Sequence, residues 1–535
     1  MNSILPQNEP VLSYGPDSGE RAGILAALKQ HAGVVTEIPL LIGGQRFSGI
    51  RTQSLHAPHD HRRQLATVSQ AGPAEVGQAI AAATAAQHEW AAMPFEARAA
   101  IFLRAADMLA GPWRQKLNAA TMLGQSKTVF QAEIDSACEL IDFLRFNVSF
   151  ARDMLQQQPL SGPGMRNALD YRPLEGFVYA VTPFNFTAIA GNLPCAPALL
   201  GNTVVWKPAF TASLSNYLFM ELLEAAGLPP GVINFVPGSA ASVSETVLDS
   251  SDFAGLHFTG STEVFDSLWQ QVSRRLPNYR SYPRLVGETG GKDFILAHPS
   301  ADPDAVAVAL LRGAFEYQGQ KCSTASRAYV PASLWPRIKC RLLDDLTTLR
   351  MGDVENLGNF IGAVIDRKAF ERIAGYINNA RSAGESILAG GICDDSHGYF
   401  VTPTVIEVED PQAVTMREEI FGPVLSVMVY PDRAWSEILA TVDGTSPYAL
   451  TGAVFANDRL ALEEASQRLR FSAGNFYFND KPTGAVVGQQ PFGGGRRSGT
   501  NDKAGSVLNL QRWTSPRTVK ETWVPAKNYR YPHMS

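Results

Sequence analysis

The chain has 535 residues, of which 45% are hydrophobic and 18% are charged, and its formal net charge is −5. This length exceeds what one hydrophobic core usually organises, so we expect two or three structural units. The sequence contains no cluster of basic residues, and its net charge is small, so neither a nucleic acid nor an anionic membrane is expected as a partner.

The N-terminal residues 1–20 contain no Arg or Lys and no apolar run of signal-peptide length. Neither a secretory signal nor an Arg-rich transit peptide is therefore predicted, and cytoplasm is the expected compartment. A mature mitochondrial form that has lost its presequence stays an alternative. Five widely spaced cysteines fit a reducing compartment better than a disulfide framework, and without a CxxC pair or an HExxH helix no metal site is expected.

Residues 73–155 are predicted to form a helical layer. Apolar residues recur at helical spacing in three Ala-rich stretches, Ala74–Ala92, Ala97–Ala110 and Gln131–Phe146. The following stretch, Gln156–Met165, contains proline and glycine without helical periodicity, so it marks a boundary between units.

From Gly176 onward, short apolar strands alternate with helices. The expected strands are 177–181, 203–206, 233–236 and 256–258, and the expected helices are 187–200, 213–226, 242–249 and 262–275. This alternation indicates βαβ units and a parallel sheet, which binds ligands at the carboxyl ends of its strands. The asparagines and prolines within 176–206 argue against a membrane span there.

A second alternating unit is expected from about Phe294 to Asp480. Its strand candidates are 326–330, 424–430 and 452–455. Two α/β domains that face each other across a cleft would account for the length of the chain.

Cys322 is the most informative single residue, because it follows the polar, glycine-bearing stretch 315–321. A cysteine is a nucleophile only as its thiolate, and Lys321 is a positive neighbour. Glu288, in the glycine-flanked run 287–293, can act as a base. A small buried thiol is the simpler interpretation of one cysteine by itself.

Three further segments have a functional and a structural interpretation. Asn185 follows a buried strand, where its amide can donate to an oxyanion or bind loop backbone. The turn 258–262 opens a helix and can bind phosphate or simply cap that helix, although no GxGxxG run is present. The glycine-rich run 491–499 can bind an anion or form a flexible surface turn.

Together these segments resemble the aldehyde dehydrogenase family, in that family's order. The matching motifs are Pro183–Phe186, Trp206–Pro208, Phe258–Ser261, Gly287–Lys292, Gly319–Cys322, Glu418–Pro423 and Pro491–Gly494. Other features resemble the branch that oxidises glutamate γ-semialdehyde with NAD, in the second step of proline breakdown. They are Phe184, Phe315–Cys322, Ala473–Asp480, Gly488–Phe492 and Ser498–Lys503.

The resemblance implies a catalytic role for three residues. Cys322 would attack the aldehyde carbon, Asn185 and the N–H of Cys322 would hold the oxyanion, and Glu288 would activate the water that hydrolyses the thioester. The presence of Glu288 disfavours a CoA-acylating variant. Dehydrogenation of another small acidic semialdehyde, or a catalytically silent NAD-binding relative, remain the alternatives.

The resemblance also implies the binding residues. The expected NAD contacts are Thr182, Pro183, Phe184, Lys207, Gly260, Ser261, Thr262, Glu419 and Phe421. Phe210 stands where many NAD-preferring relatives carry a carboxylate, but no arginine replaces it, so NAD is expected, with NADP as a weaker alternative. The expected substrate contacts are Ser323, Gly484, Ala485, Phe186 and Phe492.

The implied fold is α/β, with two Rossmann-type domains and an extended oligomerisation flap. Residues 1–155 and 172–287 would bind NAD, 288–505 would form the catalytic domain, and 156–171 with 506–535 would form the flap and the C-terminal tail. The segments 156–171 and 514–525 would pair and reach a neighbouring subunit, so a homodimer is the smallest expected assembly. A functional link to proline dehydrogenase is a further implied partnership.

Overall fold

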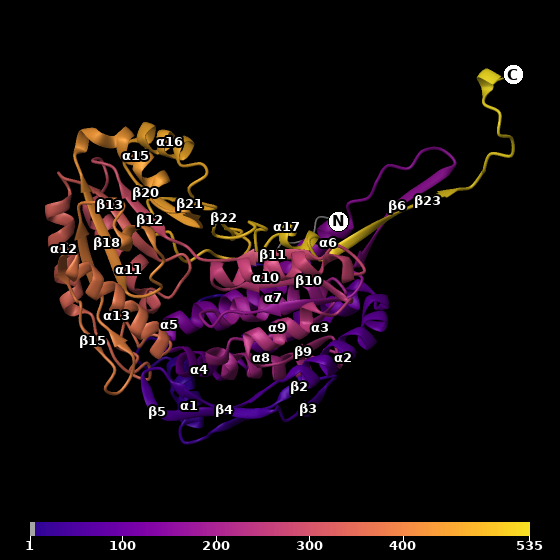
Figure 1. The fold of residues 1–535 in the computed structure, drawn as a ribbon, viewed down its shortest axis with the longest axis horizontal. Helices are drawn as coiled ribbons and strands as arrows, with labels where there is room; N and C mark the ends of the chain where they lie inside the picture. Colours follow the sequence, from indigo (N-terminus) through magenta and orange to yellow (C-terminus); the bar gives the residue numbers. More distant parts are fainter. Residues whose placement is uncertain (1–5, 535) are drawn as a thin grey trace.

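The computed structural model describes residues 6–534. Within this range, two seven-stranded sheets organise two α/β bodies, one from the N-terminal half of the chain and the other built on residues 293–478 (Figure 1). The α/β architecture expected from the sequence is confirmed.

The first sheet is parallel except at one edge, where β2 and β3 run antiparallel to their neighbours. Its order is β11 (Arg284–Glu288), β10 (Phe253–Thr259), β7 (Phe177–Val181), β8 (Thr203–Lys207), β9 (Ile233–Phe235), β2 (Leu40–Ile42) and β3 (Gln45–Phe47). The central strands β7 to β10 are buried along their whole length because helices cover both faces. Along β7, Phe177 and Tyr179 pack with α2 (Pro73–Ala92) and α9 (Ala240–Leu248), whereas Val178 and Ala180 pack into the core on the opposite face.

The predicted helical layer covers that opposite face. It consists of α3 (Phe95–Ala110), α4 (Arg114–Gln125) and α6 (Leu140–Leu155), packed on α7 (Thr187–Leu199) and α8 (Ser213–Ala225). The structure differs from the prediction in one respect, because the expected helix 131–146 contains the π-helical segment η1 (Glu133–Glu139). Hydrophobic periodicity does not distinguish one extra residue per turn.

A small sheet at the N-terminus was not predicted. It pairs β1 (Thr36–Ile38) with β5 (Asp60–Gln70), and β5 with β4 (Arg51–Ala57), beside α1 (Gly19–His31). Most of β4 is exposed and polar, so it lacks the apolar alternation by which a strand is recognised in a sequence.

The second sheet has the order β14 (Ser386–Ala389), β17 (Thr404–Val408), β18 (Val424–Tyr430), β13 (Ala325–Pro331), β12 (Asp293–Ala297), β20 (Thr451–Phe455) and β21 (Asn475–Phe478). Only β14 is antiparallel among these strands. One face packs against α11 (Pro303–Phe315) and α12 (Trp335–Thr348). The other packs against α13 (Arg367–Ser382), α15 (Trp435–Gly444) and α16 (Arg459–Arg468).

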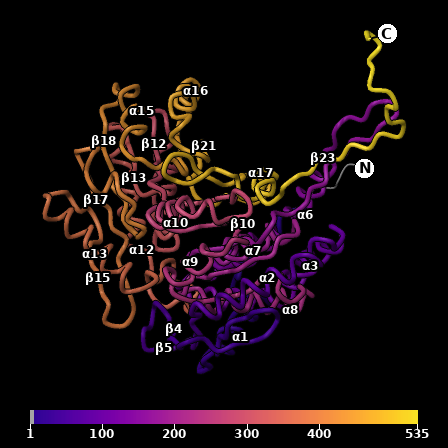
Figure 2. The backbone as a smooth tube through the Cα atoms, turned by 45° about the vertical axis from the view of Figure 1, so that its right-hand side comes forward, coloured from indigo at the N-terminus to yellow at the C-terminus, as the bar shows by residue number. Residues whose placement is uncertain are grey.

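A two-stranded ribbon leaves the first body and projects away from it (Figure 2). Strand β6 (Met165–Pro173) pairs antiparallel with β23 (Thr514–Thr522), from Thr514 beside Pro173 to Thr522 beside Met165. The predicted pairing is confirmed for residues 165–171, whereas residues 156–164 form no strand.

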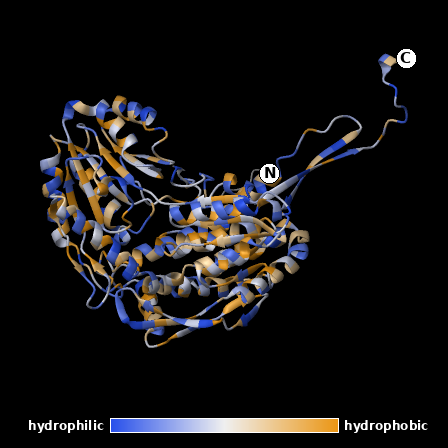
Figure 3. Cartoon of the chain, viewed as in Figure 1, coloured by the Kyte–Doolittle hydropathy of each residue, from blue (hydrophilic) through white to orange (hydrophobic). Residues whose placement is uncertain are grey.

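Apolar residues concentrate in the two sheets and on the inner faces of their helices (Figure 3). Among residues 6–534 no helix is both long enough and apolar enough to cross a membrane.

Candidate active site

The strands of the first sheet place the predicted cofactor residues at one edge. In the parallel register Val181 lies beside Lys207 and Phe258, and Thr259 lies beside Glu288. Residues that follow these strands therefore emerge together at their carboxyl ends, which is where open α/β sheets bind ligands.

Lys207 has the chemistry to bind a ribose hydroxyl at this edge. Its side chain is buried, and its ammonium donates to the carbonyl oxygen of Pro208 at 3.0 Å. An ammonium has three N–H donors, so others are left for a ligand. Burial lowers the pKa of Lys207 to about 8, because the charged ammonium is less stable away from water. A hydrogen-bond acceptor on a bound ligand would offset this loss of stability. The residues present thus fit a dinucleotide.

The turn before α10 (Thr262–Arg275) is more than a helix cap. Ser261 occupies the N-cap position, but its side chain makes no capping hydrogen bond. Thr262 instead joins two other segments, since its hydroxyl donates to the carbonyl of Arg497 and accepts from the N–H of Gly290 at 3.2 Å. The helix N-terminus is thereby held beside the glycine-rich segments, with its dipole available to an anion.

Two aromatic residues from different bodies meet at the same edge. The rings of Phe184 and Phe421 lie 5.8 Å apart in an edge-to-face arrangement. The nearby Glu419 accepts the N–H of Gly291 at 2.9 Å, and burial is the main cause that raises its pKa to about 7. The predicted contacts for the nicotinamide end thus come together across the two bodies.

A cavity of about 830 Å³ contains the predicted nucleophile and the predicted base, whereas Asn185 is not among the residues that line it. Seven of the predicted site residues line it, namely Cys322, Glu288, Ser323, Gly484, Ala485, Phe186 and Phe492. Sequence analysis did not single out Glu139, Arg312 and Lys481, which line it as well. Lys481 directly follows the motif 473–480, so its position in the sequence was the available signal.

Cys322 is held in a tight turn at the amino end of β13. The N–H of Lys321 donates to the hydroxyl of Thr324 at 3.2 Å, and the N–H of Thr324 donates to the carbonyl of Lys321 at 3.0 Å. The pKa of Cys322 is raised well above its usual value, chiefly by burial and then by Asp293 and other carboxylates. The protonated thiol is therefore the resting form.

Lys321 does not supply the positive neighbour that the sequence suggested. Its ammonium forms an ion pair with Glu316 at 3.0 Å, and both side chains are buried. A charge that is neutralised in this way stabilises a thiolate little, so the activation of Cys322 requires a proton acceptor.

Asn185 matches the structural one of the two interpretations made from the sequence. Its amide nitrogen donates to the carbonyl oxygen of Gln320 at 3.0 Å, so it binds loop backbone. That loop is the one that carries Cys322. The amide has a second N–H, so it can also donate to an oxyanion formed beside the cysteine.

Glu288 ends β11 as a buried carboxyl group next to the glycine-rich run. Its Oε2 atom has no hydrogen-bond partner within residues 6–534. A Cβ atom at Gly493 would lie 3.1 Å from its Oε1, so the glycine leaves room for this side chain. Burial raises the pKa of Glu288 well above its usual value, although Lys503 opposes the shift.

The glycine-rich run 491–499 is not a flexible surface turn. The N–H of Thr289 donates to the carbonyl of Ser498 at 3.1 Å, and Gly499 pairs with Glu288 in a β-bridge. Lys503, to which the sequence assigned no role, donates to the carbonyls of Gly474 and Gly493 at 2.8 and 2.9 Å. The run is thus fixed against the Glu288 segment.

A buried ion pair holds the start of α7, immediately after Asn185 and Phe186. Lys127 and Asp135 lie 2.6 Å apart, and the ammonium of Lys127 lies 4.3 Å from the centre of the Phe186 ring. The Asp135 carboxylate also accepts the N–H groups of Thr187 and Ala188 at 3.0 and 2.8 Å. Asp135 therefore caps α7 through tertiary contacts.

We expect Asp135→Ala to lower the free energy of unfolding by about 3–5 kcal/mol, because it leaves the Lys127 charge buried without its partner. The measurement is the urea midpoint followed by tryptophan fluorescence. Asp345→Ala is the matched control, since its pair with Arg341 is exposed and should change stability by less than about 0.5 kcal/mol. Equal midpoints for the two variants would contradict the structural role of Asp135.

The comparisons with known proteins agree with this geometry. The model of the aldehyde dehydrogenase family matches residues 47–519. A mitochondrial Delta-1-pyrroline-5-carboxylate dehydrogenase of Bos taurus is 52% identical over 538 residues, which cover 100% of this chain and 95% of the relative.

Two solved structures are similar over nearly the whole chain. A Delta-pyrroline-5-carboxylate dehydrogenase of Mycobacterium tuberculosis bound with NAD is 56% identical, with a TM-score of 0.96, and the match covers 100% of both chains. A 1-pyrroline-5-carboxylate dehydrogenase from Thermus with bound NAD is 32% identical, with a TM-score of 0.92, covering 98% of this chain and 100% of the other.

Proposed function

The chain belongs to the aldehyde dehydrogenase family, and from this membership we propose that it oxidises L-glutamate γ-semialdehyde to L-glutamate with NAD. The semialdehyde forms when Δ1-pyrroline-5-carboxylate opens by hydrolysis, so the reaction is the second step of proline catabolism. The observation that supports the proposal most directly is the single cavity lined by Cys322, Glu288, Ser323, Gly484 and Ala485.

The reaction begins with covalent capture of the aldehyde. The thiol of Cys322 gives its proton to a water molecule, and Sγ bonds to the aldehyde carbon while the electron pair of the carbonyl π bond moves to the oxygen, which becomes an oxyanion. Asn185 and the N–H of Cys322 stabilise this charge, and one such donor contributes roughly 10²–10³-fold to a rate. NAD, when bound, accepts the hydride that leaves the substrate carbon.

Glu288 acts on the thioester that remains on Cys322. Its carboxylate removes a proton from water as the water oxygen attacks the thioester carbon, and the carbon–sulfur bond then breaks. The products are the γ-carboxylate of glutamate and a free Cys322. Because burial raises its pKa, Glu288 is a stronger base than an exposed carboxylate, which suits the removal of a proton from water.

The positions described above support the following proposed cofactor and substrate contacts. NAD would lie along the carboxyl edge of the first sheet, between Lys207 and the start of α10, and reach the cavity past Phe184 and Phe421. NADP is a weaker alternative, since Phe210 leaves no carboxylate to repel a ribose phosphate. Ser323 and the N–H groups of Gly484 and Ala485, which line the cavity, would bind the α-carboxylate, with Phe186 and Phe492 against the aliphatic carbons.

The test is NADH absorbance after pyrroline-5-carboxylate and NAD are added to the protein. We expect a kcat/KM for this substrate well above that for succinic semialdehyde, which lacks the amino acid group, and above that for propanal. Absence of NADH with pyrroline-5-carboxylate would overturn the proposal. Preference for succinic semialdehyde would favour a dehydrogenase of another acidic semialdehyde.

We further propose that the flap of β6 and β23 packs on a second copy of the chain, so that the enzyme is at least a homodimer. The exposed apolar side chains of Val519 and Trp523 support this proposal. From the family resemblance we also propose that residues 1–155 and 172–287 bind NAD and that residues 288–505 form the catalytic domain. A cytoplasmic location and a functional link to proline dehydrogenase remain proposals of the same kind.

A further inference from the structure

The N-terminal segment Asn8–Tyr14, here named the N-terminal strap, forms part of the wall of the reaction cavity. Asn8, Glu9 and Val11 line the same cavity as Cys322 and Glu288. None of these three residues has a role in the proposed chemistry. The strap lies in no helix or strand, so its position depends on side-chain contacts.

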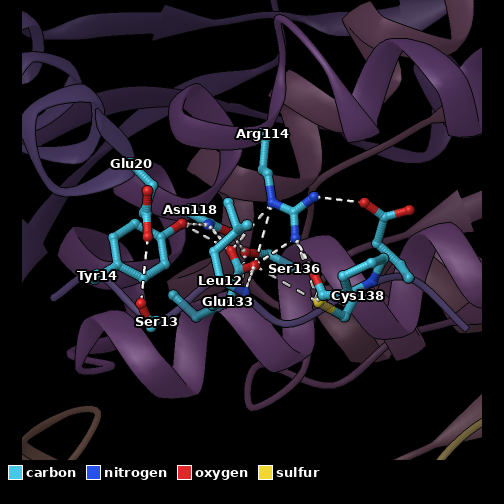
Figure 4. A network of polar contacts seen from close by, with 12 residues as sticks. Leu12, Ser13, Tyr14, Glu20, Arg114, Asn118, Glu133, Ser136 and Cys138 are labelled. Atoms are coloured by element: carbon cyan, nitrogen blue, oxygen red, sulfur yellow. Dashed lines mark hydrogen bonds and ion pairs between the residues drawn. The ribbon is translucent and has the colours of Figure 1, made fainter. Parts of the chain in front are cut away.

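The C-terminal half of the strap is anchored by the buried carboxylate of Glu133 (Figure 4). This carboxylate accepts the N–H of Leu12 at 2.9 Å and the hydroxyl of Tyr14 at 2.8 Å. Arg114 forms a buried ion pair with Glu133 and also contacts Glu9 at 2.6 Å. Hydrogen bonds to buried charged groups are the strong ones, so the strap has a fixed position on the helical layer.

The N-terminal end of the strap connects this anchored segment to the opposite wall. The amide nitrogen of Asn8 donates to Asp142 at 2.8 Å and to the carbonyl oxygen of Val487 at 2.7 Å. Its amide oxygen accepts from the side chain of Gln489 at 2.9 Å. A single side chain thus links α6 to the loop that contains Val487 and Gln489.

That loop, residues 481–492, carries Gly484 and Ala485. It lies between β21 and the short strand β22 (Gly495–Arg496) and has no helix or strand of its own. Within the loop, Lys481 donates to the carbonyl of Thr483 at 2.8 Å, and Gln490 accepts the N–H of Val486 at 2.9 Å. These contacts shape the loop locally, whereas Asn8 ties it to the helical layer.

We propose that Asn8 is a positioning residue that fixes the Gly484–Ala485 turn and thereby sets the affinity for the α-carboxylate of the substrate. This inference rests on the proposed function. Asn8 acts through the loop and touches no reacting atom, so it should influence binding of the carboxylate and leave the chemistry at Cys322 unchanged.

The test compares Asn8→Ala with Ser13→Ala, a control in the same strap whose side chain bonds only the exposed Glu20 within the described residues. For Asn8→Ala we expect the KM for glutamate semialdehyde to rise about tenfold, the effect of one or two lost hydrogen bonds, with kcat changed less than about twofold. The kcat/KM for propanal, which has no carboxylate, should stay within about twofold of wild type. Ser13→Ala should match the wild type with both aldehydes.

Gln489→Ala removes one of the two hydrogen bonds that link Asn8 to the loop and leaves the bond to the Val487 carbonyl in place. It should raise KM in the same direction as Asn8→Ala but by less, and the effect of the double variant should be smaller than the sum of the two single effects, because the two residues share one interaction. Equal losses of kcat/KM with both aldehydes, or no loss with either, would overturn the inference.

Hydrogen exchange of the amides in 484–490 tests the contact without turnover. Exchange should be faster in Asn8→Ala than in wild type or Ser13→Ala. Unchanged exchange would overturn the inference even in an active enzyme. If the wild type proved inactive but Asn8→Ala still showed faster exchange, the proposed function would be wrong while the contact between Asn8 and the loop would stand.

Discussion

Replacement of Cys322 by alanine is expected to reduce NADH formation from pyrroline-5-carboxylate by at least about 10⁴-fold, the scale on which enzymes respond to loss of a covalent nucleophile. Without Sγ there is no atom to capture the aldehyde carbon, and the oxyanion site next to the cysteine has no charge to stabilise. The measurement is steady-state NADH absorbance at saturating NAD.

Cys340→Ala is the matched control, since Cys340 is an exposed cysteine whose thiol contacts Asp344 one helical turn away. It should retain wild-type activity within about twofold, as surface substitutions usually do. An undiminished rate in Cys322→Ala, with a thermal midpoint equal to that of the wild type, would eliminate Cys322 as the nucleophile.

Replacement of Glu288 by glutamine is expected to separate the two halves of the reaction. The first turnover should still release about one NADH per active site, because Cys322 is intact. Steady turnover should then slow by about 10²–10⁴-fold, since the amide cannot take the proton of the attacking water. Rapid-mixing absorbance records both phases, and steady turnover equal to that of the wild type would contradict the role of Glu288.

The same residue predicts a pH dependence. Only the carboxylate form of Glu288 is a base, so wild-type kcat should rise as the pH increases through its raised pKa. Lys503 lowers that pKa and burial raises it, with burial the larger effect. In Glu288→Gln this rise should disappear, which distinguishes a missing base from general damage to the site.

Much of the fold is encoded locally, and the sequence predicted those parts. Strands β7 and β18 and helix α10 begin and end at the predicted residues, because an apolar run flanked by turn residues identifies a strand that is buried on both faces. The exposed strand β4 lacks this signal, and hydrophobic periodicity does not reveal the π-helical segment η1.

The proposed reactive residues come from sequence motifs, but the motifs do not show the environment of these residues. Nothing next to Cys322 in the sequence indicates that Lys321 is neutralised by Glu316, or that burial and, after it, nearby carboxylates raise the pKa of the thiol. These effects depend on which distant groups share the cavity, so the tertiary structure was needed to find them.

The sequence by itself determined the two α/β units, the family resemblance and the residue types required for a thioester reaction. Only the tertiary structure decided which walls enclose the reaction centre. Asn8 and Val487 are 479 positions apart, and their hydrogen bond depends on the packing of the strap, α6 and the 481–492 loop. Periodicity and turn chemistry report on neighbours in the chain, whereas a contact of this range exists only once both bodies have folded against each other.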